Sequence, residues 1–208
     1  MKIKDPSIEL HIGDLPEAID FGSSVACDTE TMGLRFSRDR LCLIQLSSGD
    51  GSAHLVQFRQ GSYDAPNLKA LLADPKITKI FHYARFDVAT IRSYLGIECQ
   101  PVYCTKIASR LARTYTDRHG LKDVCWELVK VDLSKEQQSS DWGAETLSQE
   151  QIRYAADDVL YLHAVRKKLQ AMLEREGRSE LAEACFKFLT TRADLDLGGW
   201  GDLDIFSH

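Results

Sequence analysis

Four carboxylates and one phenol stand at spacings that could build a metal site for phosphodiester cleavage. Asp28 and Glu30 lie two residues apart in a segment predicted to be a strand, so both side chains point to one face. Tyr154 and Asp158 lie four residues apart in a predicted helix and share one helical face. Asp87 follows a predicted buried strand, near the start of another helix. A fold that brought these five residues together would create a cluster of hard oxygen ligands.

Such a cluster has a definite chemistry. Carboxylates are the usual ligands of Mg²⁺ and Mn²⁺, and four of them together would repel one another strongly without cations. Two ions roughly 4 Å apart would relieve this repulsion and clamp the attacking and departing oxygens of a phosphate. The Tyr154 hydroxyl is better suited to orienting the attacking water. Each spacing alone also fits an exposed strand end or a core tyrosine beside a surface aspartate, so the specificity lies in the combination.

The order of these acidic motifs along the chain, the intervals between them and the apolar segments that flank them resemble those of the DEDD superfamily of 3′-5′ exonucleases. The resemblance is to the branch with tyrosine in its third motif. Within that branch the chain resembles the RNase D group over roughly residues 8–175. Further support comes from Leu41–Ser47, Cys104–Leu111 and Gln138–Trp142. The short length and the segment Phe81–Asp87 are most similar to the bacterial nano-RNase C type.

The resemblance implies an α/β fold of the ribonuclease-H-like type, with a mixed β-sheet flanked by helices. It implies a metal-dependent 3′-5′ exoribonuclease that releases nucleoside 5′-monophosphates, with two Mg²⁺ or Mn²⁺ ions as cofactors. One ion would activate water and the other would stabilise the departing 3′-oxygen. The implied metal ligands are Asp28, Glu30, Asp87 and Asp158, and Tyr154 would orient the water.

Five more residues are candidates for substrate contact: Thr31, Leu34, His82, Arg113 and His119. The resemblance places Leu34 as an apolar wedge between the last two bases, and Thr31 beside the terminal sugar. Each of these residues also has a structural interpretation without substrate contact. Leu34 could be a turn residue packed in the core, His82 a core histidine or one that supports the metal ligands, and His119 an exposed loop histidine. Arg113 belongs to a basic group of five residues against one acid, a local charge of +4, formed by Lys106, Arg110, Arg113, Arg118 and Lys122. A second basic group lies at Arg35, Arg38 and Arg40. The two groups could form a rim that faces the phosphates of the substrate, or they could be solvated surface residues.

Composition limits the class of protein. A chain of 208 residues is long enough for one domain with a full core. The net charge of −5 argues against binding of long duplexes and is neutral toward a short strand held in a pocket. Six scattered cysteines without a Cys-x-x-Cys pair argue against a structural zinc site. The lack of a signal peptide and of an apolar run of about 18 residues predicts a cytoplasmic chain with reduced thiols and without a membrane partner.

The predicted elements begin with strands and continue mainly as helices, which indicates an α/β domain. The predicted strands are 8–12, 25–29, 41–47, 53–58 and 77–81, with a hairpin turn at Ser48–Gly51. The predicted helices are a short one beginning at Asp14–Glu17, then 67–73, 84–95, 104–113, 120–130, 149–175 and 178–192. We expect the exonuclease domain at residues 1–193. Residues 194–208 form a tail that is either flexible or in contact with a second copy through Trp200 and Phe206.

The sequence constrains the identity of the substrate less than it constrains the reaction. About 33 residues follow the long predicted helix, too few for the accessory helical domain of many RNase D relatives. This and the acidic charge favour very short single-stranded RNA, down to dinucleotides, with DNA as an alternative. Other hypotheses are RNase D-like processing of structured RNA 3′ ends and a non-catalytic nucleic-acid-binding module. The resemblance also suggests a homo-oligomer.

Overall fold

A six-stranded mixed β-sheet forms the centre of the molecule. The structure is a computed structural model that describes residues 3–17, 19–36, 38–59 and 62–208. The strand order is β1-β4-β3-β2-β5-β6. The strands are β1 (Ser7–Ile12), β2 (Ser24–Thr31), β3 (Leu41–Ser47), β4 (Ser52–Gln57), β5 (Thr78–Phe81) and β6 (Val102–Cys104).

The pairing of the strands explains why β2 is well placed to carry a site. β2 pairs antiparallel with β3 and parallel with β5, so it lies inside the sheet. β3 and β4 form the predicted antiparallel hairpin, and all seven residues of β3 are buried. β1 pairs in parallel with β4 at one edge of the sheet, and β6 pairs in parallel with β5 at the other. The predicted α/β class with a mixed sheet is confirmed.

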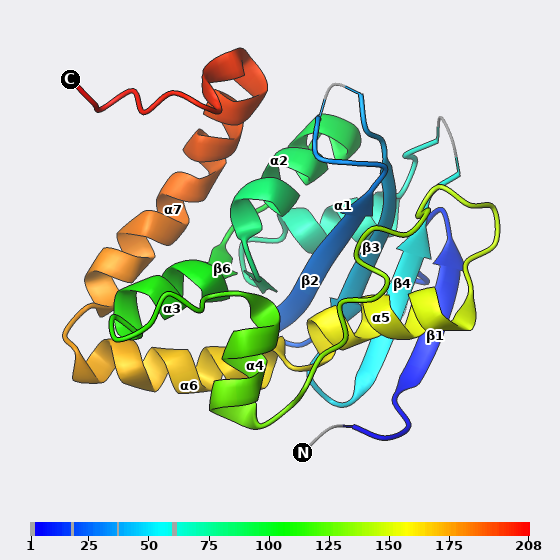
Figure 1. Ribbon diagram of the computed structural model, residues 1–208. Helices are drawn as coiled ribbons and strands as arrows, with labels where there is room; N and C mark the ends of the chain where they lie inside the picture. Colours follow the sequence, from blue (N-terminus) through cyan, green and yellow to red (C-terminus); the bar gives the residue numbers. More distant parts are fainter. Residues whose placement is uncertain (1–2, 18, 37, 60–61) are drawn as a thin grey trace.

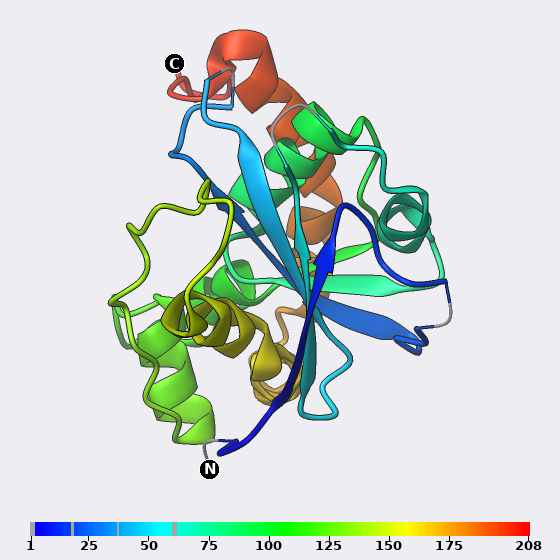
Figure 2. The ribbon, with the colours of Figure 1, turned by 90° about the vertical axis from the view of Figure 1, so that its right-hand side faces the viewer.

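Helices cover both faces of this sheet. They are α1 (Pro66–Ala73), α2 (Ala84–Leu95), α3 (Thr105–Ala112), α4 (Leu121–Val129), α5 (Gln149–Leu160), α6 (Leu162–Arg175) and α7 (Ser179–Leu195), followed by the π-helical turn η1 (Asp196–Trp200). Figure 2 views the sheet nearly edge-on, with α5 against one face and α1 on the other side. No helix within the described residues is long and apolar enough to cross a membrane.

The start of α5 is set by a local signal that the sequence already contains. The Ser148 hydroxyl accepts a hydrogen bond from the Gln151 backbone N–H, and the Gln151 side chain accepts one from the Ser148 backbone N–H. This reciprocal capping box satisfies two N–H groups that the first helical turn leaves without partners. It therefore fixes where the helix carrying Tyr154 and Asp158 begins.

The short helix predicted at Asp14–Glu17 does not form in the described part of this segment, so that prediction was wrong. The Asp14 carboxylate instead accepts hydrogen bonds from the backbone N–H groups of Asn67, at 3.0 Å, and Leu68, at 2.9 Å. Asp14 thus caps α1, a helix more than fifty residues away. Asp14 was predicted to cap a local helix, and local spacing could not identify the distant helix that it caps.

Three elements also differ clearly from the prediction. The helix expected at 149–175 is two helices that meet at Tyr161, because α5 packs on the sheet whereas α6 packs on α3 and α4. Its apolar pattern continues through the junction, so periodicity alone shows one helix. β6 was not predicted, since three residues are too few for an alternating pattern. The last helix runs to Leu195 instead of ending at 192.

Part of the C-terminal tail is attached to the domain by charge. Asp196 accepts hydrogen bonds from Arg85, at 2.6 and 2.7 Å, and from Arg192, at 2.7 Å. Beyond this anchor the chain leaves the top of α7, as Figure 1 shows, and Trp200 and Phe206 are exposed. The division of the chain at residue 193 and the contact role of the tail stay predictions.

Candidate active site

A cavity of about 630 Å³ lies where the end of β2 meets the start of α2 and the middle of α5. All five predicted catalytic residues line it: Asp28, Glu30, Asp87, Tyr154 and Asp158. The segment between α4 and α5 contributes further wall residues, and Figure 1 shows it running past β2. Residues that are far apart in the chain are thus brought to one concave site.

Local structure orients each of these side chains. Asp28 and Glu30 alternate with Thr29 along β2, and the pairing with β3 shifts register directly after Glu30. Such a bulge bends a strand and redirects its side chains. Asp87 lies in the first turn of α2, where its carboxylate accepts a hydrogen bond of 2.7 Å from the Thr29 hydroxyl.

Three of the carboxylates form a compact group. Oxygen atoms of Asp28, Glu30 and Asp158 all lie within 4.8 Å of one another. Asp87 is outside this group of three, but its charge acts on both Asp28 and Glu30. Hard carboxylate oxygens at this density are the donor set that Mg²⁺ and Mn²⁺ prefer. The residues present therefore fit a divalent cation.

Burial disfavours the charged form of all four acids, and repulsion from neighbouring carboxylates adds to this effect for Asp28, Glu30 and Asp158. Burial, reinforced by the charges of Asp87 and Asp158, raises the pKa of Asp28 well above its ordinary value. Glu30 shifts in the same direction, with burial as the largest cause of its raised pKa and Asp158 as the next. Burial also raises the pKa of Asp87 to about 7, although the hydrogen bond from Thr29 opposes the shift.

Tyr154 is coupled directly to the last of these acids. Burial raises the pKa of Asp158 to about 7, and a hydrogen bond from the Tyr154 hydroxyl opposes this rise. Burial, followed by the charges of Asp158 and Glu30, raises the pKa of Tyr154, so the phenol keeps its proton at neutral pH. The centroid of its ring lies 6.0 Å from the centroid of the Trp142 ring. Tyr154 is therefore a neutral donor held against the carboxylate cluster.

These shifts predict an unusual pH dependence of stability for the metal-free protein. The folded pKa values of Asp87 and Asp158, about 7, exceed the unfolded value of about 4. Between these values the folded state binds more protons than the unfolded state, so the free energy of unfolding falls as pH rises. We expect a loss of roughly 3 kcal/mol or more from pH 5 to pH 8 in EDTA, measured by urea unfolding.

Mg²⁺ should abolish this loss, since bound cations replace the protons that neutralise the cluster. The direction of the change in the free energy of unfolding with pH is the decisive observation. Stability in EDTA that rises between pH 5 and pH 8 would show that the four acids are not buried together.

Three of the five predicted substrate-contacting residues line the cavity: Thr31, Leu34 and His82. Leu34 is 80% exposed at the rim, so it is not a core residue. The Thr31 hydroxyl donates to the Gly33 carbonyl. Burial lowers the pKa of His82 to about 3, and its Nδ1 lies 2.9 Å from the Thr105 hydroxyl, so this histidine is neutral.

Arg113 and His119 are not among the residues that line the cavity. The Arg113 side chain is fully buried, with an ion pair to Glu127 and hydrogen bonds to the Ser109 hydroxyl and the Arg118 carbonyl. Its donors are occupied by the protein, which corrects its assignment to the phosphate-facing rim. His119 lies 2.9 Å from the same Ser109 hydroxyl. Neither residue enters the substrate contacts proposed below.

The cations that do line the cavity are lysines. Lys106 and Lys122 belong to the predicted basic group, whereas Lys135 was not singled out. The sequence offered no criterion for choosing the two lysines over the arginines beside them. Tyr83 was also missed: it lines the cavity and precedes α2 with a φ of 70°, a left-handed conformation that is uncommon for a residue other than glycine.

Comparison with known proteins places this geometry in a family. The sequence matches the 3′-5′ exonuclease family model over residues 11–174. It is 36% identical over 154 residues to ribonuclease D of Acidiphilium cryptum, an alignment that covers 74% of this chain and 39% of the relative. The chain thus spans about two fifths of the length of that curated relative.

Solved structures of Brucella melitensis NrnC superpose over nearly the whole chain. The structure bound to pGG has a TM-score of 0.95 and 56% identity, covering 98% of this chain and 100% of NrnC. The structure with bound Mg²⁺ has a TM-score of 0.93 and 56% identity, covering 97% and 99%. The predicted ribonuclease-H-like fold and the resemblance to the RNase D group and nano-RNase C are confirmed. This chain belongs to the 3′-5′ exonuclease family.

Proposed function

We propose that this protein is a metal-dependent 3′-5′ exoribonuclease that releases nucleoside 5′-monophosphates from very short RNA, including dinucleotides. The observation that carries the proposal is the convergence of Asp28, Glu30 and Asp158 in a cavity that also contains Asp87 and Tyr154. The binding of pGG and of Mg²⁺ by the similar Brucella NrnC supports both the substrate class and the metal.

The four carboxylates would hold two divalent cations, Mg²⁺ or Mn²⁺. When bound, these cations would activate a water for in-line attack and stabilise the charge of the departing 3′-oxygen. The protein keeps the four acids close together in a poorly solvated cavity at an energetic cost, as their raised pKa values indicate. Above about pH 7, where the acids lose their protons, bound cations would offset this cost by neutralising the cluster.

Tyr154 would orient the attacking water. Its hydroxyl donates its proton toward Asp158, which leaves an oxygen lone pair free to accept a hydrogen bond from a water in the cavity. Its raised pKa excludes a phenolate at neutral pH, so the residue positions the water rather than removing its proton.

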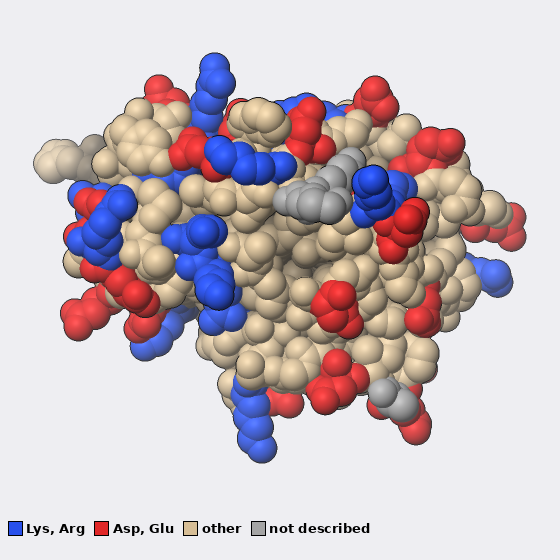
Figure 3. Space-filling view, turned by 90° about the horizontal axis from the view of Figure 1, so that it is seen from below, with Lys and Arg blue, Asp and Glu red and all other residues tan. Residues whose placement is uncertain are grey.

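Several features favour short substrates. The cavity volume is typical of pockets for small ligands, which hold about 300–1,000 Å³. Lys106, Lys122 and Lys135 could neutralise a few phosphates, and exposed Leu34 could pack against a base at the 3′ end. Figure 3 shows acidic and basic side chains interspersed over one face of the molecule, without the continuous basic surface that a long nucleic acid would use.

A comparison of substrate lengths tests the proposal. We expect a 5′-labelled RNA dinucleotide to be cleaved by the full chain with Mg²⁺ at least as fast as a seven-mer of the same composition. The reason is that the cavity contacts a short 3′ end, so added nucleotides gain few contacts. Product release is followed at equal substrate concentration, and the Asp28→Asn protein serves as the blank for contaminating nucleases.

The alternative, RNase D-like processing of structured RNA, makes the opposite prediction. It requires a dinucleotide rate well below that of the seven-mer and a steep fall of activity with salt, because many phosphates would be contacted. That outcome would contradict the proposal that dinucleotides are substrates. The corresponding DNA dinucleotide tests the preference for RNA in the same assay.

The homo-oligomer and the cytoplasmic location are part of the same proposal. Apolar side chains of the tail are exposed, including Trp200, at 49%, and Phe206, at 78%. These two residues offer a contact for a second copy of the chain.

A further inference from the structure

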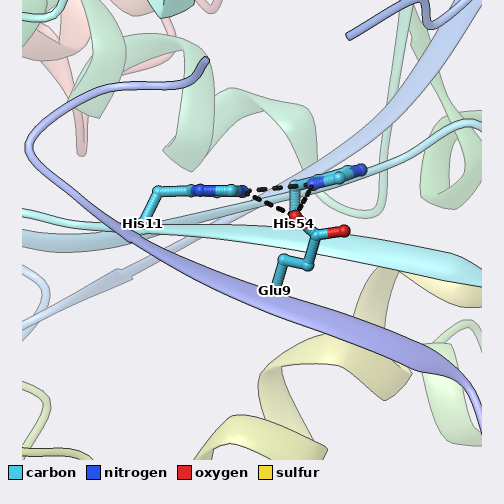
Figure 4. Close-up of side chains that lie close together, drawn as sticks. All are labelled: Glu9, His11 and His54. Carbon is cyan, nitrogen blue, oxygen red and sulfur yellow. Dashed lines mark hydrogen bonds and ion pairs between the residues drawn. The ribbon is translucent and has the colours of Figure 1, made fainter.

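A second cluster of potential metal ligands lies at the β1 edge of the sheet. Glu9 and His11 stand two residues apart on β1, and His54 of β4 is the pairing partner of Glu9. All three side chains therefore project from one face of the sheet. Figure 4 shows the two imidazole rings side by side, with the Glu9 carboxylate beneath them.

This face is the opposite of the one that carries the catalytic acids. Asp28 pairs with Gln45, which pairs with Leu55, so these three side chains share a face. His54 neighbours Leu55 along β4 and therefore points the other way. The sheet itself separates the two clusters, and none of the three residues lines the catalytic cavity.

The donor atoms of the cluster converge. His11 Nε2 lies 3.1 Å from His54 Nδ1, and Glu9 Oε2 lies 4.0 and 3.9 Å from these two nitrogens. Two nitrogen donors on one tetrahedral zinc ion, each about 2.1 Å from it, lie about 3.4 Å apart. The two nitrogens are therefore close to the spacing that one ion requires. Glu9, whose side chain is 59% exposed, can move the remaining few tenths of an ångström.

The two imidazoles are held in place and the carboxylate is free to adjust. The side chains of His11 and His54 are only 13% and 12% exposed. Their rings are nearly parallel, with centroids 5.4 Å apart and an interplanar angle of 18°, and the rings of Phe21 and His54 form an edge contact with centroids 5.7 Å apart. Preorganised ligands lose little freedom on binding a cation. Without a cation, the two nitrogens share one proton and neither is within hydrogen-bond distance of Glu9.

We propose that Glu9, His11 and His54 bind a divalent transition-metal ion, with Zn²⁺ as the reference case, at a site separate from the catalytic one. Two imidazoles and one carboxylate favour Zn²⁺, Ni²⁺ or Cu²⁺ over Mg²⁺, which prefers oxygen ligands. Three protein ligands leave a fourth position to water. The ion would link the edge strand β1 to β4 and stabilise the folded chain.

Calorimetric titration tests this site in the full chain. The EDTA-treated protein is dialysed, the catalytic acids are saturated with excess Mg²⁺, and Zn²⁺ alone is added. We expect one Zn²⁺ equivalent per chain that is absent from the His11→Gln/His54→Gln variant and present in His208→Gln, which removes an exposed histidine elsewhere. Even outer-shell partners of metal ligands are worth about 10- to 100-fold in affinity, so Glu9→Gln should weaken Zn²⁺ binding at least about tenfold.

Two further measurements keep the outcome decisive. At a Zn²⁺ concentration about 100-fold above its dissociation constant, the Tm of the wild-type chain should rise by roughly 5 °C, and that of the double variant should not. Exonuclease activity of the double variant with Mg²⁺ should stay within about twofold of wild type. If the double variant does not fold, the single variants His54→Gln and Glu9→Gln replace it. Equal Zn²⁺ binding by wild type and folded variants would overturn the proposal, and so would joint loss of Zn²⁺ binding and activity.

Discussion

Replacing Asp28 by Asn is expected to lower the exonuclease turnover at least about 10³-fold, equivalent to about 4 kcal/mol of transition-state stabilisation. Asp28 is central to the acidic cluster: its pKa responds to Asp87, Asp158 and Glu30, after burial as the largest cause. The amide keeps the shape of the side chain but supplies no charge to hold a cation. The measurement is single-turnover release of mononucleotide from an RNA dinucleotide with saturating Mg²⁺.

A stability measurement separates this loss from misfolding. In EDTA at pH 8, Asp28→Asn removes an acid whose ionisation the folded cluster opposes, so the metal-free fold should gain about 1 kcal/mol, or roughly 2–4 °C in Tm. Asp117→Asn makes the same charge change at an exposed position outside the cavity and should leave activity within about twofold. Full activity in Asp28→Asn would refute the metal-ligand assignment.

Replacing Tyr154 by Phe is expected to lower kcat about 100-fold while the requirement for Mg²⁺ persists. The ring remains beside Trp142, so packing is retained and only the hydroxyl is lost. Without the hydrogen bond from this hydroxyl, the pKa of Asp158 should rise further, because that bond opposes the effect of burial. The acid limb of the kcat–pH profile should therefore move to higher pH.

Tyr161→Phe is the matched control for this variant. Tyr161 lies at the end of the same helix, and its hydroxyl accepts a hydrogen bond of 3.1 Å from the Ile3 backbone N–H, away from the cavity. Its kcat and pH profile should match those of the wild type within about twofold. A Tyr154→Phe protein with the same kcat and pH profile as Tyr161→Phe would contradict the role given to the hydroxyl.

Two pairs of site residues were recognisable from short-range periods, Asp28 with Glu30 and Tyr154 with Asp158, and the resemblance to a known family joined them to Asp87. Residues two apart on a strand and four apart on a helix share a face wherever the element lies. The capping box at Ser148 added a local marker for the start of the helix. The apolar patterns of the strands and helices likewise indicated the α/β class. These features needed no knowledge of how the elements pack.

Contacts between distant elements determined the rest. The Arg113 side chain is fully buried and is held by an ion pair with Glu127 and a hydrogen bond to Ser109, so it is not free to contact substrate. Lys106 and Lys122 from the same basic stretch reach the cavity. No pattern of charge along the chain distinguishes these residues, because helix packing decides which cation is covered.

The cluster at the sheet edge illustrates the same limit. Glu9 and His11 are an ordinary pair on a strand, and His54 is 43 residues beyond His11. Only the parallel register of β1 with β4 sets His54 opposite Glu9. Register is a long-range property, since a shift of one residue would turn His54 to the other face of the sheet. Spacing and the resemblance to a known family therefore predicted the oxygen-rich catalytic cluster, whereas the imidazole cluster emerged only from strand pairing.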